Sequence, residues 1–354
     1  MKKELSAIEL YHLMPELKQA EGQRIAKIFM PGKKDFVFRL KNTNLRVILP
    51  GFIYLAEATP KNPDQPPNLC MQLRKHLQGG IIRSIRQIET ERVIEIEIST
   101  RSTTYMLFIE IFGKGNLILT QDDVIISALT YRRWSDRAIL KGESYVAPRP
   151  DHSFLKISEK DMQDAPDTPL AKWLAIEFGL GGTYAQEVCL QGGQPQDIPA
   201  ARSDSGRVVA AVNALVHAEL SPRIVSKGDD VLDIVPFPLK LYAEEAQQEK
   251  ESFSSAIDEA FGTRMLEQHE EQRLSGHGKK LQEIKKVLQQ QQEQQTQLEQ
   301  DREKFSQQGD FLYAHYQAIK DLLETVRSDP EGAKEHPQVA SIDRKNKRVT
   351  VDVE

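Results

Sequence analysis

The stretch from Asn68 to Leu119 constrains the fold of this chain more than any other. It begins with a basic helical run that ends at Gly79-Gly80, and four runs in which apolar and polar residues alternate follow it. Short polar turns join these runs, so neighbouring strands are expected to pair antiparallel. The stretch therefore predicts an antiparallel sheet that begins directly after a helix.

The residues around this stretch have the same character. Residues 24–51 also alternate between Gly, Pro and Asn turns, and residues 124–131 supply a further strand. A helix over residues 5–20 begins with a Ser6–Glu9 capping box, and Pro15 is expected to kink or divide it. Residues 1–150 are predicted to form one mostly antiparallel β domain, a sandwich or a barrel, covered by two helices.

Beyond residue 150 the apolar period becomes helical. Three helical runs separated by glycine turns predict a compact α module within residues 151–235. A long helical pattern then occupies residues 236–330, and a small β-hairpin is predicted at 331–354. The predicted fold class is therefore α+β: a mostly antiparallel β domain, then a helical module, then a long coiled-coil helix.

The long helix carries a heptad pattern. With Leu281 at position a, ten of the fourteen a and d positions up to Val326 are apolar or aromatic, which is typical of a coiled coil. Such a seam needs a partner helix, yet no second helical pattern follows Pro330. We therefore expect that another molecule supplies the partner, as in a dimer, or that the chain is the front part of a longer protein.

Composition and charge argue against several classes of protein. The 354-residue chain has a net charge of −5, so it is not expected to coat nucleic acid, although a local basic face remains open. No apolar run reaches the roughly 18 residues of a membrane span, and the N-terminus lacks the apolar core of a signal peptide. Cys70 and Cys189 lie in apolar helical runs and are expected to be reduced and buried. We expect a cytoplasmic protein without a membrane partner.

Motifs for catalysis and cofactor binding are not found in the sequence. The eight histidines are scattered with no pair one helical turn apart, and no P-loop or dinucleotide-binding motif occurs. The Gly113-Lys114-Gly115-Asn116 segment lies between two strands and is expected to be a hairpin turn. We therefore predict no catalytic residue, no metal site and no cofactor, and we do not expect an enzyme.

Basic residues cluster instead on the helix and first strands of the opening stretch. One interpretation is a surface that holds an RNA backbone, since arginine forks onto phosphate and glutamate accepts from a base or a 2′-hydroxyl. The other is a solvent face with a Glu91-Arg92 surface pair worth under about 1 kcal/mol. The residues alone leave both open. The cluster comprises Arg74, Lys75, His76, Arg83, Arg86, Glu91 and Arg92.

The chain resembles a known family over nearly its whole length. Its segments at residues 73–98, 107–119, 137–150, 178–193 and 307–323 resemble, in this order, those of the NFACT family of RqcH/NEMF ribosome quality-control factors. The resemblance implies an N-terminal domain like that of MutM-type DNA glycosylases, followed by a helix-two-turn-helix module. It also implies binding of the obstructed large ribosomal subunit, recruitment of tRNA and template-free C-terminal tailing with alanine.

The resemblance also implies particular site residues and partners. Family members carry an acidic residue in the first helix and an Asp-Arg pair, both implicated in tRNA recruitment, which match Glu9 and Glu91-Arg92. Glutamate stands here where aspartate is usual, which keeps the charge and lengthens the side chain. The expected partners are alanyl-tRNA and the large subunit with its peptidyl-tRNA. The expected tRNA contacts are Glu9, Glu91, Arg92, Arg74, Lys75, His76, Arg83, Arg86 and Lys114.

Family members continue into a returning helix and a basic RNA-binding domain, so the resemblance favours a chain that is part of a longer protein. Two alternatives remain. A DNA glycosylase-like protein without catalytic residues is disfavoured as an enzyme, because Lys2 and Lys3 stand where those enzymes need Pro and Glu. A fibronectin-binding surface adhesin is disfavoured by the absence of a signal-peptide pattern.

Overall fold

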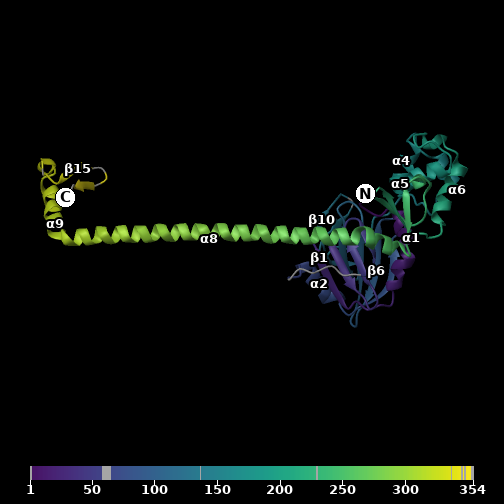
Figure 1. The fold of residues 1–354 in the computed structure, drawn as a ribbon, viewed down its shortest axis with the longest axis horizontal. Helices are drawn as coiled ribbons and strands as arrows, with labels where there is room; N and C mark the ends of the chain where they lie inside the picture. The colour runs from purple at the N-terminus through teal and green to yellow at the C-terminus, as the bar shows by residue number, and fades with distance from the viewer. Residues whose placement is uncertain are drawn as a thin grey trace. The chain divides into compact units, whose positions relative to one another are not determined.

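Two antiparallel β-sheets form the first part of the chain (Figure 1). The structure is a computed structural model, and it describes residues 2–57, 65–135, 137–228, 230–335, 337–343, 346 and 348–351. Side chains at residues 262–283 and 334–335 lie outside that description. Each sheet keeps its strands in chain order. The first contains β1 (Lys27–Gly32), β2 (Asp35–Arg39), β3 (Asn44–Ile48) and β4 (Phe52–Ala56). The second contains β5 (Ile81–Gln87), β6 (Val93–Ser99), β7 (Thr104–Glu110), β8 (Asn116–Gln121) and β9 (Val124–Ala128).

The two sheets bury their apolar faces in one core. Phe38 and Val47 from the first sheet and Ile96 and Leu107 from the second are each at most 1% exposed and belong to the same cluster. Period-two alternation turns one face of each strand inward, which is why the pattern predicted the sheets correctly. The α+β class and the antiparallel β domain are confirmed.

Helix α1 (Ala7–Leu17) lies between the two sheets and the helical module, and it contributes to the cores of both. Its capping box forms as predicted. Leu10 and Leu13 pack in the sheet core, while Ile8 packs in a second core built by the helical module. Pro15 is exposed, and the helix continues through it as one piece rather than being divided there. A second helix, α2 (Asn68–Leu77), packs on β1.

The helical module follows the β domain and has its own core. Trp173, Tyr184 and Val212, from three consecutive helices, are buried together with Phe237. A small sheet of order β13-β12-β14 completes this part. The helices are α3 (Glu159–Gln163), α4 (Leu170–Glu177), α5 (Gly181–Gln191) and α6 (Ser205–Val216), and the strands are β12 (Arg223–Lys227), β13 (Asp230–Val235) and β14 (Ala246–Glu249).

The long helix begins later than the sequence pattern predicted. Helix α8 (Thr263–Ala314) starts after α7 (Phe253–Ile257) and a π-helical turn, not near residue 236. Phe253, Ile257 and Phe261 are buried in the core of the two sheets, so this segment is held by the β domain before the exposed helix starts. The chain divides into units Met1–Gln272 and Arg273–Glu354.

In the second unit, the described seam side chains of α8 are open to solvent. Ile284, Leu298 and Phe305 are 60%, 62% and 66% exposed, while Leu281, the first predicted seam position, lies outside the described side chains. A turn at His315 separates α8 from α9 (Tyr316–Ser328), and β15 (Val339–Asp343) pairs with β16 (Arg348–Val351) as the predicted hairpin. Among the described residues, none of the helices is both long and apolar enough to cross a bilayer.

Glu16 of α1 generates a prediction about the stability of this fold. Its carboxylate accepts the amides of Phe253 at 2.7 Å and Ser254 at 2.8 Å, and so caps α7 from within the core. Glu16→Ala should therefore lower the free energy of unfolding by about 2 kcal/mol, measured by urea denaturation with circular dichroism. Lys18→Ala, on an exposed position at the end of the same helix, should change it by less than about 0.5 kcal/mol. Equal midpoints for the two variants would contradict the capping role.

Candidate functional site

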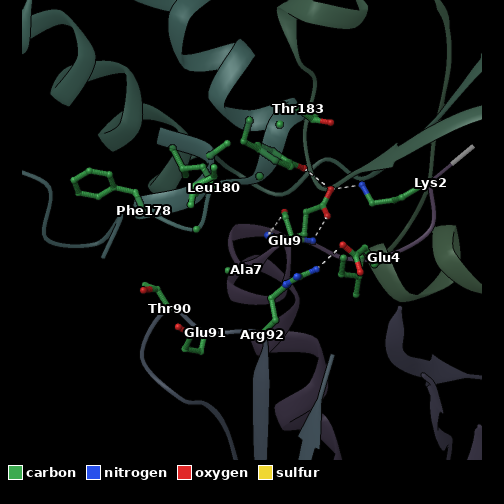
Figure 2. A pocket seen from close by; sticks show the side chains of 18 of the residues that line it. Lys2, Glu4, Ala7, Glu9, Thr90, Glu91, Arg92, Phe178, Leu180 and Thr183 are labelled. Carbon is green, nitrogen blue, oxygen red and sulfur yellow. Dashed lines mark hydrogen bonds and ion pairs between the residues drawn. The ribbon is translucent and has the colours of Figure 1, made fainter. Parts of the chain in front are cut away.

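A cleft of about 650 Å³ opens in the first unit, and three segments form most of its lining (Figure 2). One segment is the N-terminal arm with the first turn of α1, and the second is the turn from β5 to β6 at Thr90–Arg92. The third is the turn from α4 to α5. Glu9, Glu91 and Arg92, three of the residues expected from the sequence, all line this cleft.

The turn between β5 and β6 is tied directly to α1. Gln87 donates from its side-chain amide to the carbonyl oxygens of Ala7 and Glu91, each at 2.9 Å. The Glu91 amide donates to the Ile88 carbonyl at 3.0 Å and closes the turn. These bonds place Glu91 and Arg92 beside the start of α1, although about 80 residues separate them in the sequence.

The turn between α4 and α5 depends on glycine. Gly179 and Gly181 have φ angles of +68° and +76°, which other residues adopt only with strain. A Cβ on Gly181 would also come within 3.4 Å of the Ser6 Cβ. The first amides of α5 therefore lie close to the start of α1, and no side chain caps that helix end.

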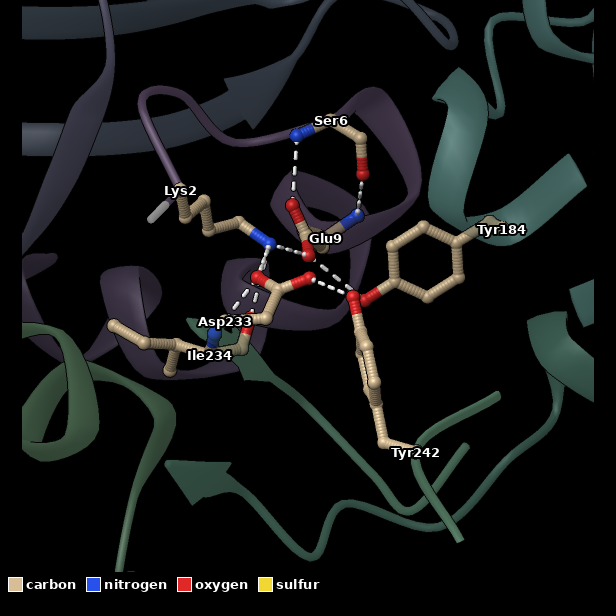
Figure 3. Close-up of polar contacts among 7 residues, drawn as sticks. All are labelled: Lys2, Ser6, Glu9, Tyr184, Asp233, Ile234 and Tyr242. Carbon is tan, nitrogen blue, oxygen red and sulfur yellow. Dashed lines mark hydrogen bonds and ion pairs between the residues drawn. The ribbon is translucent and has the colours of Figure 1, made fainter. Parts of the chain in front are cut away.

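Glu9 forms the floor of the cleft and is fully buried (Figure 3). One carboxylate oxygen accepts the Ser6 amide at 2.8 Å, which completes the capping box. The other accepts the Tyr184 hydroxyl at 2.8 Å and forms an ion pair with Lys2. Both oxygens of Glu9 thus already have donors within the protein.

Lys2 links Glu9 to the small sheet of the helical module. Its ammonium group also contacts the Asp233 carboxylate at 2.7 Å and donates to the Ile234 carbonyl at 3.0 Å. Tyr242 donates to the other Asp233 oxygen at 2.7 Å. Figure 3 shows these side chains converging from the N-terminal arm, α1, α5, β13 and the short helical turn Lys240–Tyr242.

The electrostatics of this network favour its ionised, paired form. Burial alone would lower the pKa of Lys2, but the charges of Glu9 and Asp233 outweigh it and leave that pKa raised. Burial and the neighbouring carboxylates raise the pKa of Tyr184 and of Tyr242, so both phenols remain donors. The result is a fully paired buried cluster, which is the condition under which charges in a protein interior are tolerated.

Glu91 and Arg92 lie at the rim rather than on the floor. Arg92 pairs with Glu4 at 2.7 Å, and about a third of its side chain remains exposed. Burial raises the pKa of the Glu91 carboxyl, which the neighbouring positive charges of Arg92 and Arg137 only partly offset. The rim therefore offers one guanidinium and one poorly solvated carboxylate to a ligand.

Acidic side chains outnumber basic ones on the cleft walls. A phosphate is repelled by such a surface, whereas the amino groups of base edges and ribose hydroxyls find acceptors there. The acidic lining residues are Glu4, Glu9, Glu91, Glu177 and Asp233, and the basic ones are Lys2 and Arg92.

Two of the predicted basic contacts hold the fold together. Arg74 donates to the Ile28 carbonyl at 2.7 Å, and its guanidinium lies 5.8 Å from the Phe29 ring centre, so it fastens α2 to β1. His76 bonds through Nδ1 with the Tyr105 hydroxyl at 3.1 Å, and burial lowers its pKa.

The other four basic candidates are exposed, and none of them lies among the residues described as lining the cleft. Arg86 pairs with Glu95, and two-thirds of its side chain remains exposed. Lys114 lies in the β7–β8 hairpin turn, as predicted. Lys75 and Arg83 are exposed on α2 and β5.

Sequence reasoning did not identify Lys2, Asp233 or Tyr242 as part of the site. Lys2 and Asp233 are 231 positions apart, and no spacing rule relates them. Tyr184 packs in the core of the helical module and also donates to Glu9. The described residues contain no group of three or more His, Cys, Asp or Glu side chains that could hold a metal ion.

Comparison with known proteins gives one consistent result. A family model described as NFACT N-terminal and middle domains matches residues 6–354. The archaeal Rqc2 homologue aRqcH of Methanocaldococcus jannaschii is 26% identical over 99% of this chain, which spans 57% of that relative. The Rqc2 homologue RqcH of Bacillus subtilis is 34% identical over 40% of the chain and 28% of its own length.

A solved structure shares the fold of this chain. The N-terminal part of the fibronectin/fibrinogen-binding protein from Streptococcus suis aligns with a TM-score of 0.61 and 26% identity, over 73% of this chain and 99% of the other. The chain spans less than two-thirds of the two curated relatives above.

The buried cluster generates a second prediction. Lys2→Met removes the counter-charge of Glu9 and Asp233, and should lower the free energy of unfolding by about 3–5 kcal/mol in denaturant titrations. Lys227→Met is the matched control, because Lys227 is 75% exposed and 3.9 Å from Glu245, and it should cost less than about 0.5 kcal/mol. Adding Asp233→Asn to Lys2→Met should restore part of the loss. A Lys2 variant as stable as the control would show that the pair is not formed.

Glu91 generates a third prediction, on pH dependence. A carboxyl whose pKa is raised in the folded state destabilises the fold once it ionises. This destabilisation is absent below the unfolded pKa of about 4.5 and complete at a pH above the folded pKa. Glu91→Gln should therefore raise the melting temperature at neutral pH, and the gain should vanish as the pH falls to about 4. Thermal melts across this range measure it. A gain that persists at acidic pH would contradict burial of an ionised carboxylate.

Proposed function

The chain belongs to the family of the NFACT N-terminal and middle domains, and from this premise we propose that it is a ribosome quality-control factor that binds tRNA in the cleft. Relatives named as Rqc2 homologues and as NEMF, a ribosome quality control complex subunit, support the general role. The proposal further includes binding of tRNA, binding of the large ribosomal subunit and support of C-terminal tailing.

The convergence of three residues carries the proposal. Glu9 and the Glu91-Arg92 pair were expected to act together only because of a family resemblance, and they lie on different elements of the sequence. In the structure they line one cleft, with Glu91 and Arg92 at its rim. A well-formed pocket with a few convergent polar groups is the usual setting of a binding site.

The acid-rich walls suggest which part of a tRNA enters the cleft. Glu91 can accept from a base amino group or a ribose 2′-hydroxyl, and Arg92 can fork onto a base edge if it leaves Glu4. Base edges of this kind are accessible in single-stranded loops and ends. Phosphates would instead meet the exposed basic residues outside the cleft, including Lys75, Arg83 and Arg86.

In this proposal the chain is a scaffold and not an enzyme. It would bring tRNA, alanyl-tRNA in the first instance, to a large subunit that carries an obstructed peptidyl-tRNA, where the ribosome itself extends the nascent chain. The exposed apolar seam of α8 would pair with a second helix, either from another copy or from a longer form of the protein.

Binding of tRNA tests this function. Glu91→Gln and Arg92→Gln should each weaken binding by about tenfold, because a polar contact with a base is worth about 1–3 kcal/mol. Fluorescence anisotropy of labelled tRNA at fixed salt measures the affinity. Arg83→Gln is the matched control: it is exposed outside the cleft, and it should cost less and act mainly by reducing the salt dependence.

The proposal fails if both cleft variants bind tRNA as the unmodified chain does. Two other outcomes would point to the alternatives considered from the sequence. Cleavage of duplex DNA with a damaged base would indicate a glycosylase, and saturable binding to immobilised fibronectin without tRNA binding would indicate an adhesin.

A further inference from the structure

A short hairpin next to the cleft presents an unusual exposed surface. It consists of β10 (Arg132–Arg133) paired with β11 (Ala138–Ile139). Tyr131 and Trp134 flank the first strand and are 47% and 39% exposed, although large aromatic side chains are mostly buried in folded proteins. The two arginines between them are exposed as well.

The hairpin rests on a firm base. Ile139 is 1% exposed and packs with Phe108 and Ile118 in a small core beneath the second sheet. The Trp134 amide donates to the Arg137 carbonyl at 2.8 Å, which closes the hairpin. The exposed aromatic side chains are therefore carried on an ordered element.

Arg137 supports Trp134 and connects it to the cleft. Its guanidinium donates to both oxygens of the buried Glu110, at 2.8 and 3.2 Å, and lies 5.0 Å from the Trp134 ring centre. It also lies 5.7 Å from the ring centre of Phe112, whose neighbour Ile111 donates its amide to the Arg92 carbonyl at 2.8 Å. The hairpin is thus continuous with the rim of the cleft.

Arg132 and Arg133 are exposed and supply the positive charges that the hairpin offers to a ligand. Arg132 lies 5.8 Å from the Trp134 ring centre, and Arg133 is 3.5 Å from Glu143 in a pair of which both members are more than half exposed. An exposed ion pair of this kind contributes little to stability, so Arg133 can leave Glu143 and bind another anion. Glu143 pairs with Arg133, and Glu110 accepts hydrogen bonds from Arg137 and Tyr145.

We propose that Trp134 forms a stacking surface for an unpaired nucleotide of RNA, with Arg132 and Arg133 on the flanking phosphates. Aromatic rings beside arginines are what single-stranded RNA requires, because an unpaired base has a free π-face and its backbone is anionic. A duplex does not fit, since its bases are stacked on one another. This inference rests on the proposed function, since it extends the tRNA interface from the cleft onto the hairpin.

The chain allows a direct measurement of stacking. It has only two tryptophans, and the other, Trp173, is 5% exposed. In a Trp173→Phe variant, Trp134 is the only tryptophan, and titration with a stem-loop RNA that has an unpaired loop should quench its fluorescence. A duplex RNA of the same length should not. The affinity of this variant for the same RNA, measured by anisotropy, should match that of the unmodified chain.

Substitutions complete the test. Trp134→Ala should weaken binding of the stem-loop RNA by about tenfold, and Trp134→Phe, which keeps a ring, by less. Arg133→Gln should lower the salt dependence of binding. Duplex RNA should bind equally to the unmodified chain and to Trp134→Ala.

The outcomes separate this inference from the proposed function. If tRNA binding depends on Glu91 and Arg92 while Trp134 is neither quenched nor needed, the stacking surface is refuted and the cleft assignment stands. If no RNA binds to any form of the chain, both fail. Equal quenching by duplex RNA, or quenching only by an acidic peptide, would also overturn the assignment of this surface to unpaired nucleotides.

Discussion

The buried polar side chains of α1 are the constraint on which the first unit depends. Glu9, His12 and Glu16 recur at helical spacing, and each binds a segment that is distant in sequence. Glu9 holds Lys2 and Tyr184, His12 donates through Nε2 to the Leu215 carbonyl at 2.9 Å, and Glu16 caps α7. Since a buried carboxylate without a partner is strongly destabilising, the fold depends on each of these segments lying against the helix.

The cleft is a consequence of this assembly. Pairing of Lys2 with Glu9 and Asp233 brings the N-terminal arm against the helical module, and Gln87 holds the Glu91 turn against the other side of α1. On the floor, Glu9 is therefore bonded to residues of the protein itself. At the rim, the partly exposed Arg92 guanidinium and the Glu91 carboxylate can contact a ligand. Burial at the rim raises the pKa of the Glu91 carboxyl, because its ionised form is poorly solvated there.

Prediction from sequence succeeded where the evidence was local. Alternation predicted the sheets, and the Ser6–Glu9 spacing predicted the capping box, because both depend on neighbours within a few residues. The start of α8 was predicted too early, since burial of Phe253 and Phe261 against the sheets is a tertiary contact that a helical pattern does not contain. Tertiary contacts also decide which basic residues of the predicted cluster are structural. Arg74 bonds α2 to β1, whereas Arg83 is exposed to solvent.

The sequence by itself determined the α+β class, the order of sheets and helices, the exposed heptad seam and, through a family resemblance, three residues of the candidate site. Only the tertiary structure decided that Glu9 lies on the floor and Glu91 and Arg92 at the rim. It also decided that Lys2, Asp233 and Tyr242 complete the cluster, and that Trp134 lies next to the cleft. Periodicity and capping reach only a few residues along the chain, whereas a buried charge can be paired by any residue that the fold brings within hydrogen-bonding distance.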